Sequence, residues 1–148
     1  MVRLRSSTPA DGLRAVEIWA AAVDATHHFL AAEDREAIGN EVAEFLPYAS
    51  LTLAIDADNR PVAFMLVAQG RLEALFVDPA HHGKGIGRIM MAQALAENPG
   101  LCVDVNAQNS GAWAFYRRMG FVETGRSALD GQGRPYPLVH LRYAQSGA

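Results

Sequence analysis

Residues 71–90 read RLEALFVDPAHHGKGIGRIM, and this stretch decides how the rest of the chain is interpreted. Its first part, RLEALFVDP (71–79), is typical of a strand closed by Asp-Pro, and GRIMMAQALAEN (87–98) is typical of a helix. A glycine loop joins the two. The first backbone N–H groups of a helix have no intrahelical partner and lie at the positive end of its dipole, so this junction is a candidate anion site.

Two common phosphate loops do not fit the glycine pattern. The nucleoside-triphosphate loop requires Gly-Lys-Ser/Thr, and here Lys84 is followed by Gly85. A dinucleotide fingerprint requires glycine or alanine where Met90 stands, in an early strand–helix unit. Neither pattern fits, and the glycines by themselves do not decide between another kind of anion site and a simple turn of the chain.

The remaining elements are placed by the period of their apolar residues. Leu13, Val16, Ala20 and Val23 recur at helical spacing after Thr8-Pro9, which predicts a helix to about Thr26. The other expected segments are strands at 2–6, 50–56, 61–69, 101–106, 121–131 and 134–144, and helices at 31–46 and from 109 or 110 to 119. Asn109 is a candidate cap for the last helix, and Gly120 is expected to end it. The predicted order is β-α-α-β-β-β-α-β-α-β-β. This predicts an α/β (α+β) protein, a single domain over residues 1–148, with a mixed central sheet of about seven strands flanked by about four helices.

Composition excludes several functional classes. The net charge is −3 with no long basic run, so we expect no nucleic-acid partner. The longest apolar run, at 62–68, is too short for a bilayer, and MVRLRSSTPADG has no signal-peptide character, so we expect a cytoplasmic protein without a membrane partner. Cys102 is the single cysteine and is expected to be an inert thiol. Four of the five histidines occur as the adjacent pairs His27-His28 and His81-His82 rather than at i, i+4 spacing, so no metal is expected.

Two motifs resemble the GNAT superfamily of N-acetyltransferases. His82-Gly83-Lys84-Gly85-Ile86-Gly87 is similar to the family's acyl-CoA loop, Arg/Gln-x-x-Gly-x-Gly/Ala, with histidine in the place of arginine or glutamine. The second motif, Asn-x-x-Ala-x-x-x-Tyr-x-x-x-Gly-Phe, is complete as Asn109, Ala112, Tyr116, Gly120 and Phe121. The stretches VDATHHFL, EALFVDP, DVNAQN and GRPYPL also resemble the small bacterial YjaB-like branch.

The resemblance implies a GNAT-like fold and transfer of an acetyl group from acetyl-CoA to a primary amine by direct attack in a ternary complex. Backbone amides near Lys84 and Arg88 would hold the pyrophosphate, and the Val77 N–H would polarise the thioester carbonyl. The expected acetyl-CoA contacts are Leu75, Phe76, Val77, His82, Gly83, Lys84, Gly85, Ile86, Gly87, Arg88, Asn106, Asn109, Ala112 and Tyr116.

The expected catalytic residues are Tyr116 and Glu73. The resemblance gives Tyr116 the role of protonating the departing thiolate, whereas a core aromatic is the alternative. Glu73 shares a strand face with residues 75 and 77, and it is a candidate base for the incoming amine, directly or through water. A surface carboxylate near Arg71 is the alternative.

The acceptor side of the reaction is the least defined. His27 and His28 follow the first helix and are candidates for base or substrate contact, and Phe29 and Trp19 could line the same cleft. Asp24 would suit a small cationic amine if it lay there too. A small-molecule amine is the expected acceptor, with a protein or peptide amine or a catalytically silent acyl-CoA sensor as alternatives. A homodimer through the closing strands is possible.

Overall fold

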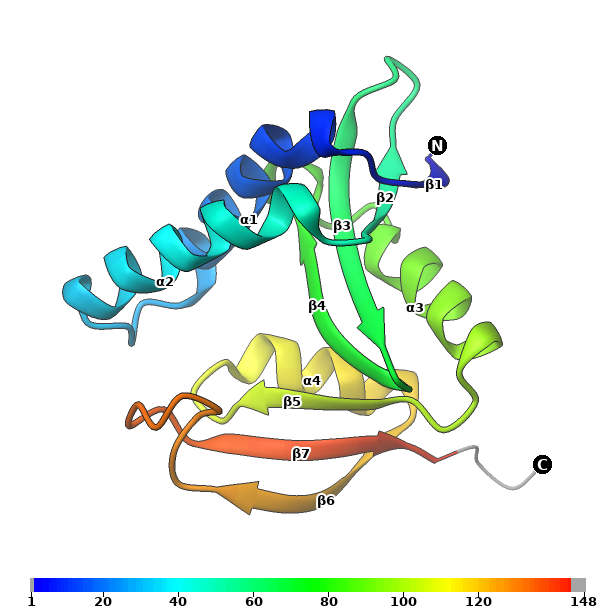
Figure 1. Cartoon of the computed structure of the whole chain (residues 1–148). Helices are drawn as coiled ribbons and strands as arrows, with labels where there is room; N and C mark the ends of the chain where they lie inside the picture. The colour runs from blue at the N-terminus through cyan, green and yellow to red at the C-terminus, as the bar shows by residue number, and fades with distance from the viewer. Residues whose placement is uncertain (1, 145–148) are drawn as a thin grey trace. The chain divides into compact units, whose positions relative to one another are not determined.

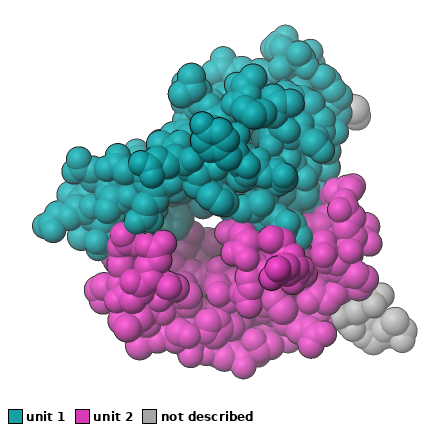
Figure 2. Space-filling view, in the orientation of Figure 1, with its two compact units in different colours: residues 1–67, 74–91 teal, residues 68–73, 92–148 magenta. Residues whose placement is uncertain are grey.

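The computed structural model describes residues 2–144, and the chain forms two compact units. Figure 2 shows the first unit, residues 1–67 and 74–91, in teal, and the second, residues 68–73 and 92–148, in magenta. The expectation of one domain over residues 1–148 remains a prediction. Strand β4 contributes residues to both units, so its two halves are considered with the unit to which each belongs.

The described residues confirm the predicted order of seven strands and four helices, with three short 3-10 turns (η) in addition (Figure 1). Hydrogen bonds join the strands in the order β1-β2-β3-β4-β5-β7-β6. The elements are β1 Arg3–Ser6, η1 Pro9–Asp11, α1 Gly12–Thr26, α2 Ala32–Phe45, η2 Leu46–Tyr48, β2 Thr52–Ile55, β3 Pro61–Ala68, β4 Arg71–Val77, η3 Pro79–His81, α3 Ile86–Glu97, β5 Cys102–Asn106, α4 Ser110–Met119, β6 Phe121–Ser127 and β7 Leu138–Tyr143.

The core of the first unit lies between β2–β3 and the helix pair α1 and α2. Its fully buried centre includes Ile18 of α1 and Leu53, Ile55 and Phe64 of the strands. From α2, by contrast, Ile38 and Val42 are only partly buried against this cluster. Helix α1 is therefore fixed by its apolar face, whereas α2 is held more loosely at the edge of the core.

The predicted apolar face of α1 is partly wrong. Leu13 is 84% exposed, while Val16 and Ala20 are only partly buried. The buried face is shifted around the helix and consists of Gly12, Ala15, Ile18, Trp19, Ala22 and Val23. Small residues take part in this face because α1 packs closely on η2: a Cβ at Gly12 would lie 2.7 Å from the Cβ of Pro47. At Gly12, the close approach to Pro47 leaves no room for a side chain.

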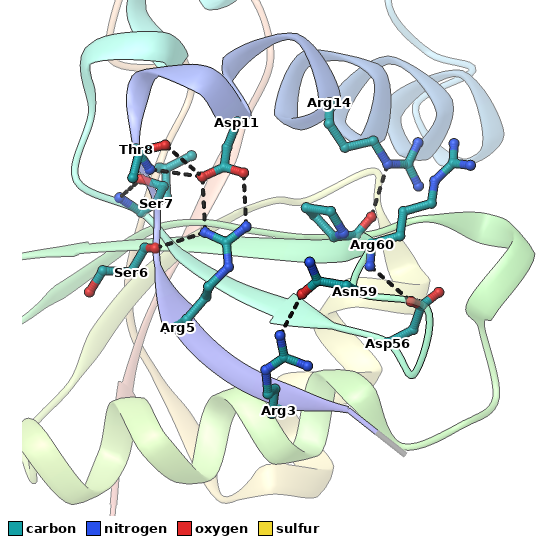
Figure 3. A network of polar contacts seen from close by, with 12 residues as sticks. Arg3, Arg5, Ser6, Ser7, Thr8, Asp11, Arg14, Asp56, Asn59 and Arg60 are labelled. Carbon is teal, nitrogen blue, oxygen red and sulfur yellow. Dashed lines mark hydrogen bonds and ion pairs between the residues drawn. The ribbon is translucent and has the colours of Figure 1, made fainter.

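A polar network fixes the entry into η1 and α1 (Figure 3). The Asp11 carboxylate accepts hydrogen bonds from the Arg5 guanidinium at 3.0 Å and from the Thr8 backbone N–H at 2.8 Å. These bonds, chiefly that from Arg5, hold the pKa of Asp11 at about 2, well below its usual value. The predicted N-terminal signal is thus present, but it opens a 3-10 turn one turn ahead of the α-helix.

The second unit contains antiparallel β5, β7 and β6, the start of β4, the end of α3 and helix α4. The first residues of β4 run parallel to β5, with Arg71 opposite Cys102 and Leu72 opposite Val103. Alternate residues of β5 and β7 are buried on one face: Val103, Val105, Val139 and Leu141. Their neighbours Asp104 and His140 therefore lie on the opposite face.

The two closing strands are shorter than predicted. The predicted strands 121–131 and 134–144 correspond to β6 and β7, and residues 128–137 form turns between them. One carboxylate oxygen of Asp130 accepts from the backbone N–H groups of Gln132 and Arg134, each at 2.9 Å. Pro135 and Pro137 cannot donate to a β-ladder, so the pairing starts only at Leu138.

Candidate active site

The glycine loop follows β4 in the first unit, as predicted, but the 3-10 turn η3 lies between them. His82 is extended, and Gly83 and Gly85 then have φ angles of +79° and +77°. L-residues with side chains rarely adopt such angles. A Cβ added at either glycine would meet nothing within 4 Å, so the space beside the loop is open. Backbone conformation, not crowding, requires glycine at both positions.

Helix α3 begins directly after Gly85. The Gly85 carbonyl accepts from the Ile89 N–H at 3.1 Å, which makes this the first bond of the helix. The N–H groups of residues 86–88 precede that bond and have no intrahelical acceptor. Ile86 is buried and anchors the turn, Gly87 is half-buried, and His82, Lys84 and Arg88 are exposed. The junction thus combines backbone donors, an open approach and two cationic side chains.

The start of the loop is anchored by Asp78. Its backbone N–H donates to the Val62 carbonyl at 2.9 Å, and its carboxylate accepts from the Ala80 N–H at 3.0 Å and from the Arg14 guanidinium at 2.7 Å. Burial would raise the pKa of Asp78, but the hydrogen bonds from Arg14 and Ala80 outweigh it, so that pKa lies below its usual value. An ionised Asp78 therefore ties the loop to α1.

Arg14 helps to anchor the glycine loop, although the sequence alone did not indicate this role. Besides Asp78, its guanidinium binds the Pro61 carbonyl at 2.9 Å, so one side chain joins α1, β3 and the loop. Arg14 is 64 residues from Asp78 along the chain. No local pattern in the sequence could have paired them.

The predicted residues of β4 are divided by the chain's two units. Phe76 packs its ring against Phe64 at 5.6 Å between centroids and contacts the core cluster of the first unit. Leu75 and Val77 are half-buried. Glu73 is exposed and belongs to the second unit.

In the second unit, two asparagines shape the start of α4. The side-chain oxygen of Asn106 accepts from the Gln108 N–H at 2.8 Å, and that of Asn109 accepts from the Ala112 N–H at 3.1 Å. Asn109 is therefore the N-cap of α4, as the sequence indicated. Gly120 ends the helix with a φ of +108°, the predicted left-handed C-terminal stop.

Tyr116 lies on the buried face of α4, and its residue exposure is only 7%. Its ring makes edge contacts with Phe115 and Phe121 at 5.3 and 5.4 Å between centroids. Burial raises the pKa of the Tyr116 phenol well above its usual value. The hydroxyl therefore holds its proton at neutral pH, which is the state that a proton donor requires.

The residues expected on the acceptor side cluster at the end of α1. The Thr26 hydroxyl lies 2.7 Å from Nδ1 of His27, and the His27 ring lies 5.2 Å from the ring of Phe29. Burial, with a smaller effect of the neighbouring His28 charge, lowers the pKa of His27. Nε2 of His28 lies 3.0 Å from the Ala25 carbonyl, a helix-end contact. Burial therefore favours the neutral form of the His27 ring.

Trp19 is more deeply buried than the other residues expected on the acceptor side. It is 6% exposed and belongs to the core cluster. The Arg35 guanidinium stacks 4.6 Å above its ring and binds Asp24 at 2.7 Å. The Asp24 carboxylate is therefore already neutralised by Arg35 and is not a free anion for a small cationic amine.

Residues 2–144 show neither a metal cluster nor a membrane-spanning helix. They contain no group of three or more His, Cys, Asp or Glu side chains arranged to hold a metal ion. Within the same residues, no helix has the length and apolarity needed to cross a bilayer.

Comparison with known proteins defines the class. Residues 24–123 match the Acetyltransferase (GNAT) domain, which covers both motifs. The chain belongs to the GNAT family and is an acyl-CoA-dependent N-acetyltransferase.

Its similarity to individual members extends over nearly the full length. The chain is 43% identical over 143 residues to the peptidyl-lysine N-acetyltransferases YjaB of Salmonella typhimurium and Escherichia coli, covering 97% of this chain and 99% and 97% of those proteins. The solution structure of apo YjaB from E. coli superposes with a TM-score of 0.93 over 100% of this chain and 99% of that one. The predicted YjaB-like branch is confirmed.

Proposed function

We propose that this chain transfers the acetyl group of acetyl-CoA to the ε-amino group of lysine in a protein or peptide. The glycine loop carries the donor half of this proposal, because two glycines at positive φ lead into a helix whose first amides face an open approach. The acceptor half is supported by the 43% identity to two peptidyl-lysine N-acetyltransferases.

The loop residues fit a pyrophosphate. Backbone N–H groups at a helix start bind anions without a charged side chain, and a Cβ at residue 83 or 85 would impose another backbone conformation. Lys84 and Arg88 are exposed and add positive charge, and the Lys84 ammonium lies 3.3 Å from Nδ1 of His81. The other proposed acetyl-CoA contacts in the first unit are Leu75, Phe76, His82, Ile86 and Gly87, and those in the second unit are Asn106, Asn109 and Ala112.

Bound acetyl-CoA supplies a thioester that is activated toward an amine. Tyr116 then gives its proton to the departing sulfur, a role supported by its place in the second motif, which the GNAT domain match covers. The backbone N–H of Val77 stabilises the negative charge that develops on the carbonyl oxygen. Direct attack in a ternary complex requires that acetyl-CoA and the amine be bound together, with the amine nitrogen oriented toward the thioester carbonyl.

The acceptor ammonium must lose a proton before it attacks. Glu73 is exposed, so an incoming amine or a water molecule can reach its side chain, which supports its role as the base. His27 is the second candidate, because a neutral imidazole can accept a proton and its lowered pKa favours that form. Phe29, His28 and Trp19 remain proposed contacts of the acceptor.

A lysine side chain is preferred over the small amine expected from sequence. The one carboxylate on α1 that seemed suited to a small cation, Asp24, is bound by Arg35. A lysine in a peptide instead brings its own backbone as additional binding surface, so its recognition does not require a buried anion.

The test measures CoA thiol released from acetyl-CoA with lysine peptides, the same peptides with acetylated lysine, polyamines and free amino acids. Turnover that requires the unmodified lysine supports the proposal. Turnover on polyamines or amino acids alone would show that the acceptor is a small amine and not a protein lysine. Acetyl-CoA binding without turnover on any amine would indicate a sensor. Mass spectrometry of the peptide then locates the acetyl group.

A further inference from the structure

Four polar side chains from four strands of the second unit contact one another in series, and this series is called the polar chain below. The Arg71 guanidinium on β4 lies 3.1 Å from one carboxylate oxygen of Asp104 on β5. The other oxygen lies 2.7 Å from Nδ1 of His140 on β7, and Nε2 of His140 lies 2.6 Å from the hydroxyl of Ser127 on β6. None of these contacts is used by the acetyl transfer proposed above.

Strand register brings the side chains of the polar chain together. Asp104 and His140 are directly opposite one another in the β5–β7 ladder, and Ser127 is paired with Leu138, two residues before His140. A register shift between Glu123 and Gly125 lies on the same strand as Ser127. The side chains of Asp104 and His140 are 34% and 33% exposed, so this part of the polar chain is accessible to a small molecule from solvent.

The contacts determine where the protons lie. An ionised carboxylate only accepts hydrogen bonds, so Nδ1 of His140 must donate to Asp104. In the neutral ring, Nε2 then carries the lone pair and accepts from the Ser127 O–H. The Arg71 guanidinium lies against the second carboxylate oxygen of Asp104. A hydroxyl, an imidazole that accepts its proton and a carboxylate that orients the imidazole are the parts of an activated nucleophile, whatever their order in the chain.

We propose that Ser127 is a nucleophile that takes an acyl group from an activated acyl ester, with His140 as its base and Asp104 as the residue that orients the base. The Ser127 oxygen attacks the ester carbonyl while its proton passes to Nε2 of His140. The bond to the leaving alcohol breaks, the alcohol takes that proton, and an acyl-serine remains. Water then releases the carboxylic acid and regenerates the hydroxyl. This ester hydrolysis is independent of lysine acetylation and goes beyond it.

The experiment uses p-nitrophenyl acetate and the full chain. We expect p-nitrophenolate release above the buffer rate, and intact-protein and peptide mass spectra with one acetyl group on Ser127. Ser127→Ala abolishes this adduct, and His140→Asn lowers the acylation rate by about 10²-fold, the usual size of a general-base effect. Asp104→Asn lowers it as well, because the wrong ring nitrogen is then protonated.

Matched variants separate this inference from instability and from the proposed function. Thr124→Ala removes a hydroxyl from the same strand, one that donates to the His140 carbonyl rather than to its ring, and it keeps the ester activity. Tyr116→Phe keeps the ester activity while lysine acetylation falls. Thermal unfolding of Ser127→Ala is compared with that of Thr124→Ala to show that both fold. Ester hydrolysis by Ser127→Ala at the wild-type rate, or an acetyl group only on other residues, overturns the inference.

Discussion

The glycine loop of the first unit and the polar chain of the second unit are built in opposite ways. The loop's chemistry comes from neighbouring residues, since Gly83 and Gly85 set the backbone and the next amides are its donors. In the polar chain, Asp104 and His140 are 36 residues apart, and Ser127 and His140 are 13 apart. A site built from consecutive residues can be recognised in a sequence, whereas a site built by strand register cannot.

The largest expected effect tests whether the second unit contributes to acetyl transfer at all. Tyr116→Phe removes only the hydroxyl and leaves the edge contacts with Phe115 and Phe121 in place. We expect kcat for lysine acetylation to fall by about 10²-fold or more, a typical general-acid contribution, with acetyl-CoA affinity unchanged. Steady-state kinetics and calorimetric titration with acetyl-CoA measure the two quantities. An unchanged kcat removes Tyr116 from the mechanism.

The next effect concerns the base. Glu73→Gln keeps the shape of the side chain but cannot take a proton at neutral pH, so kcat/KM for the lysine peptide is expected to fall by about 10²-fold. His27→Gln serves as the matched comparison, because that imidazole is the other candidate. Whichever variant retains the wild-type pH–rate profile is not the base.

The glycine loop itself is tested by Gly83→Ala and Gly85→Ala. Because a Cβ at either position meets open space, the change acts through φ alone, at a cost of about 1–2 kcal/mol for a left-handed residue. We expect KM for acetyl-CoA to rise by about tenfold, with kcat nearly unchanged.

Gly131→Ala is the control for the loop variants. Its Cβ also meets open space, and its φ lies outside the left-handed region. An equal rise of KM in all three variants would show that backbone conformation in the loop is not what binds the donor.

The smallest effect concerns a local pair, Arg5 and Asp11, which lie six residues apart. The folded-state pKa of Asp11, about 2, is below the ordinary 3.8, so the folded state binds this proton less tightly than the unfolded state. The ionised carboxylate therefore stabilises the fold above about pH 4, and this contribution is lost as the pH falls toward 2. Asp11→Asn is expected to lower the free energy of unfolding at pH 7 by about 0.5–1 kcal/mol, since the pair is partly solvated.

Urea titrations of wild type and Asp11→Asn at several pH values between 2 and 7 check the direction of this effect. The difference between the two proteins should shrink as the solution is acidified. A constant difference at all pH values would assign the effect to the Thr8 cap rather than to the charge.

Much of the fold could be predicted because its signals are local. The apolar run of β3, the cap at Asn109 and the left-handed stop at Gly120 all depend on neighbouring residues, and each was found where expected. Errors arose where a partner far along the chain decided the outcome. Leu13 is exposed because η2 packs on the small residues of α1, and the closing strands are shortened by the turns around Asp130.

The sequence by itself determined the order of elements, the place of the glycine loop between a strand and a helix, and the resemblance to the GNAT family through two motifs of closely spaced residues. Only the tertiary structure decided which charges are neutralised, as with Arg14 on Asp78 and Arg35 on Asp24, and which polar side chains meet. The physical reason is the separation along the sequence of the residues that interact. Backbone conformation and capping are set within a few residues, whereas ion pairs and hydrogen-bonded chains depend on packing and strand register, which join residues that no sequence window contains.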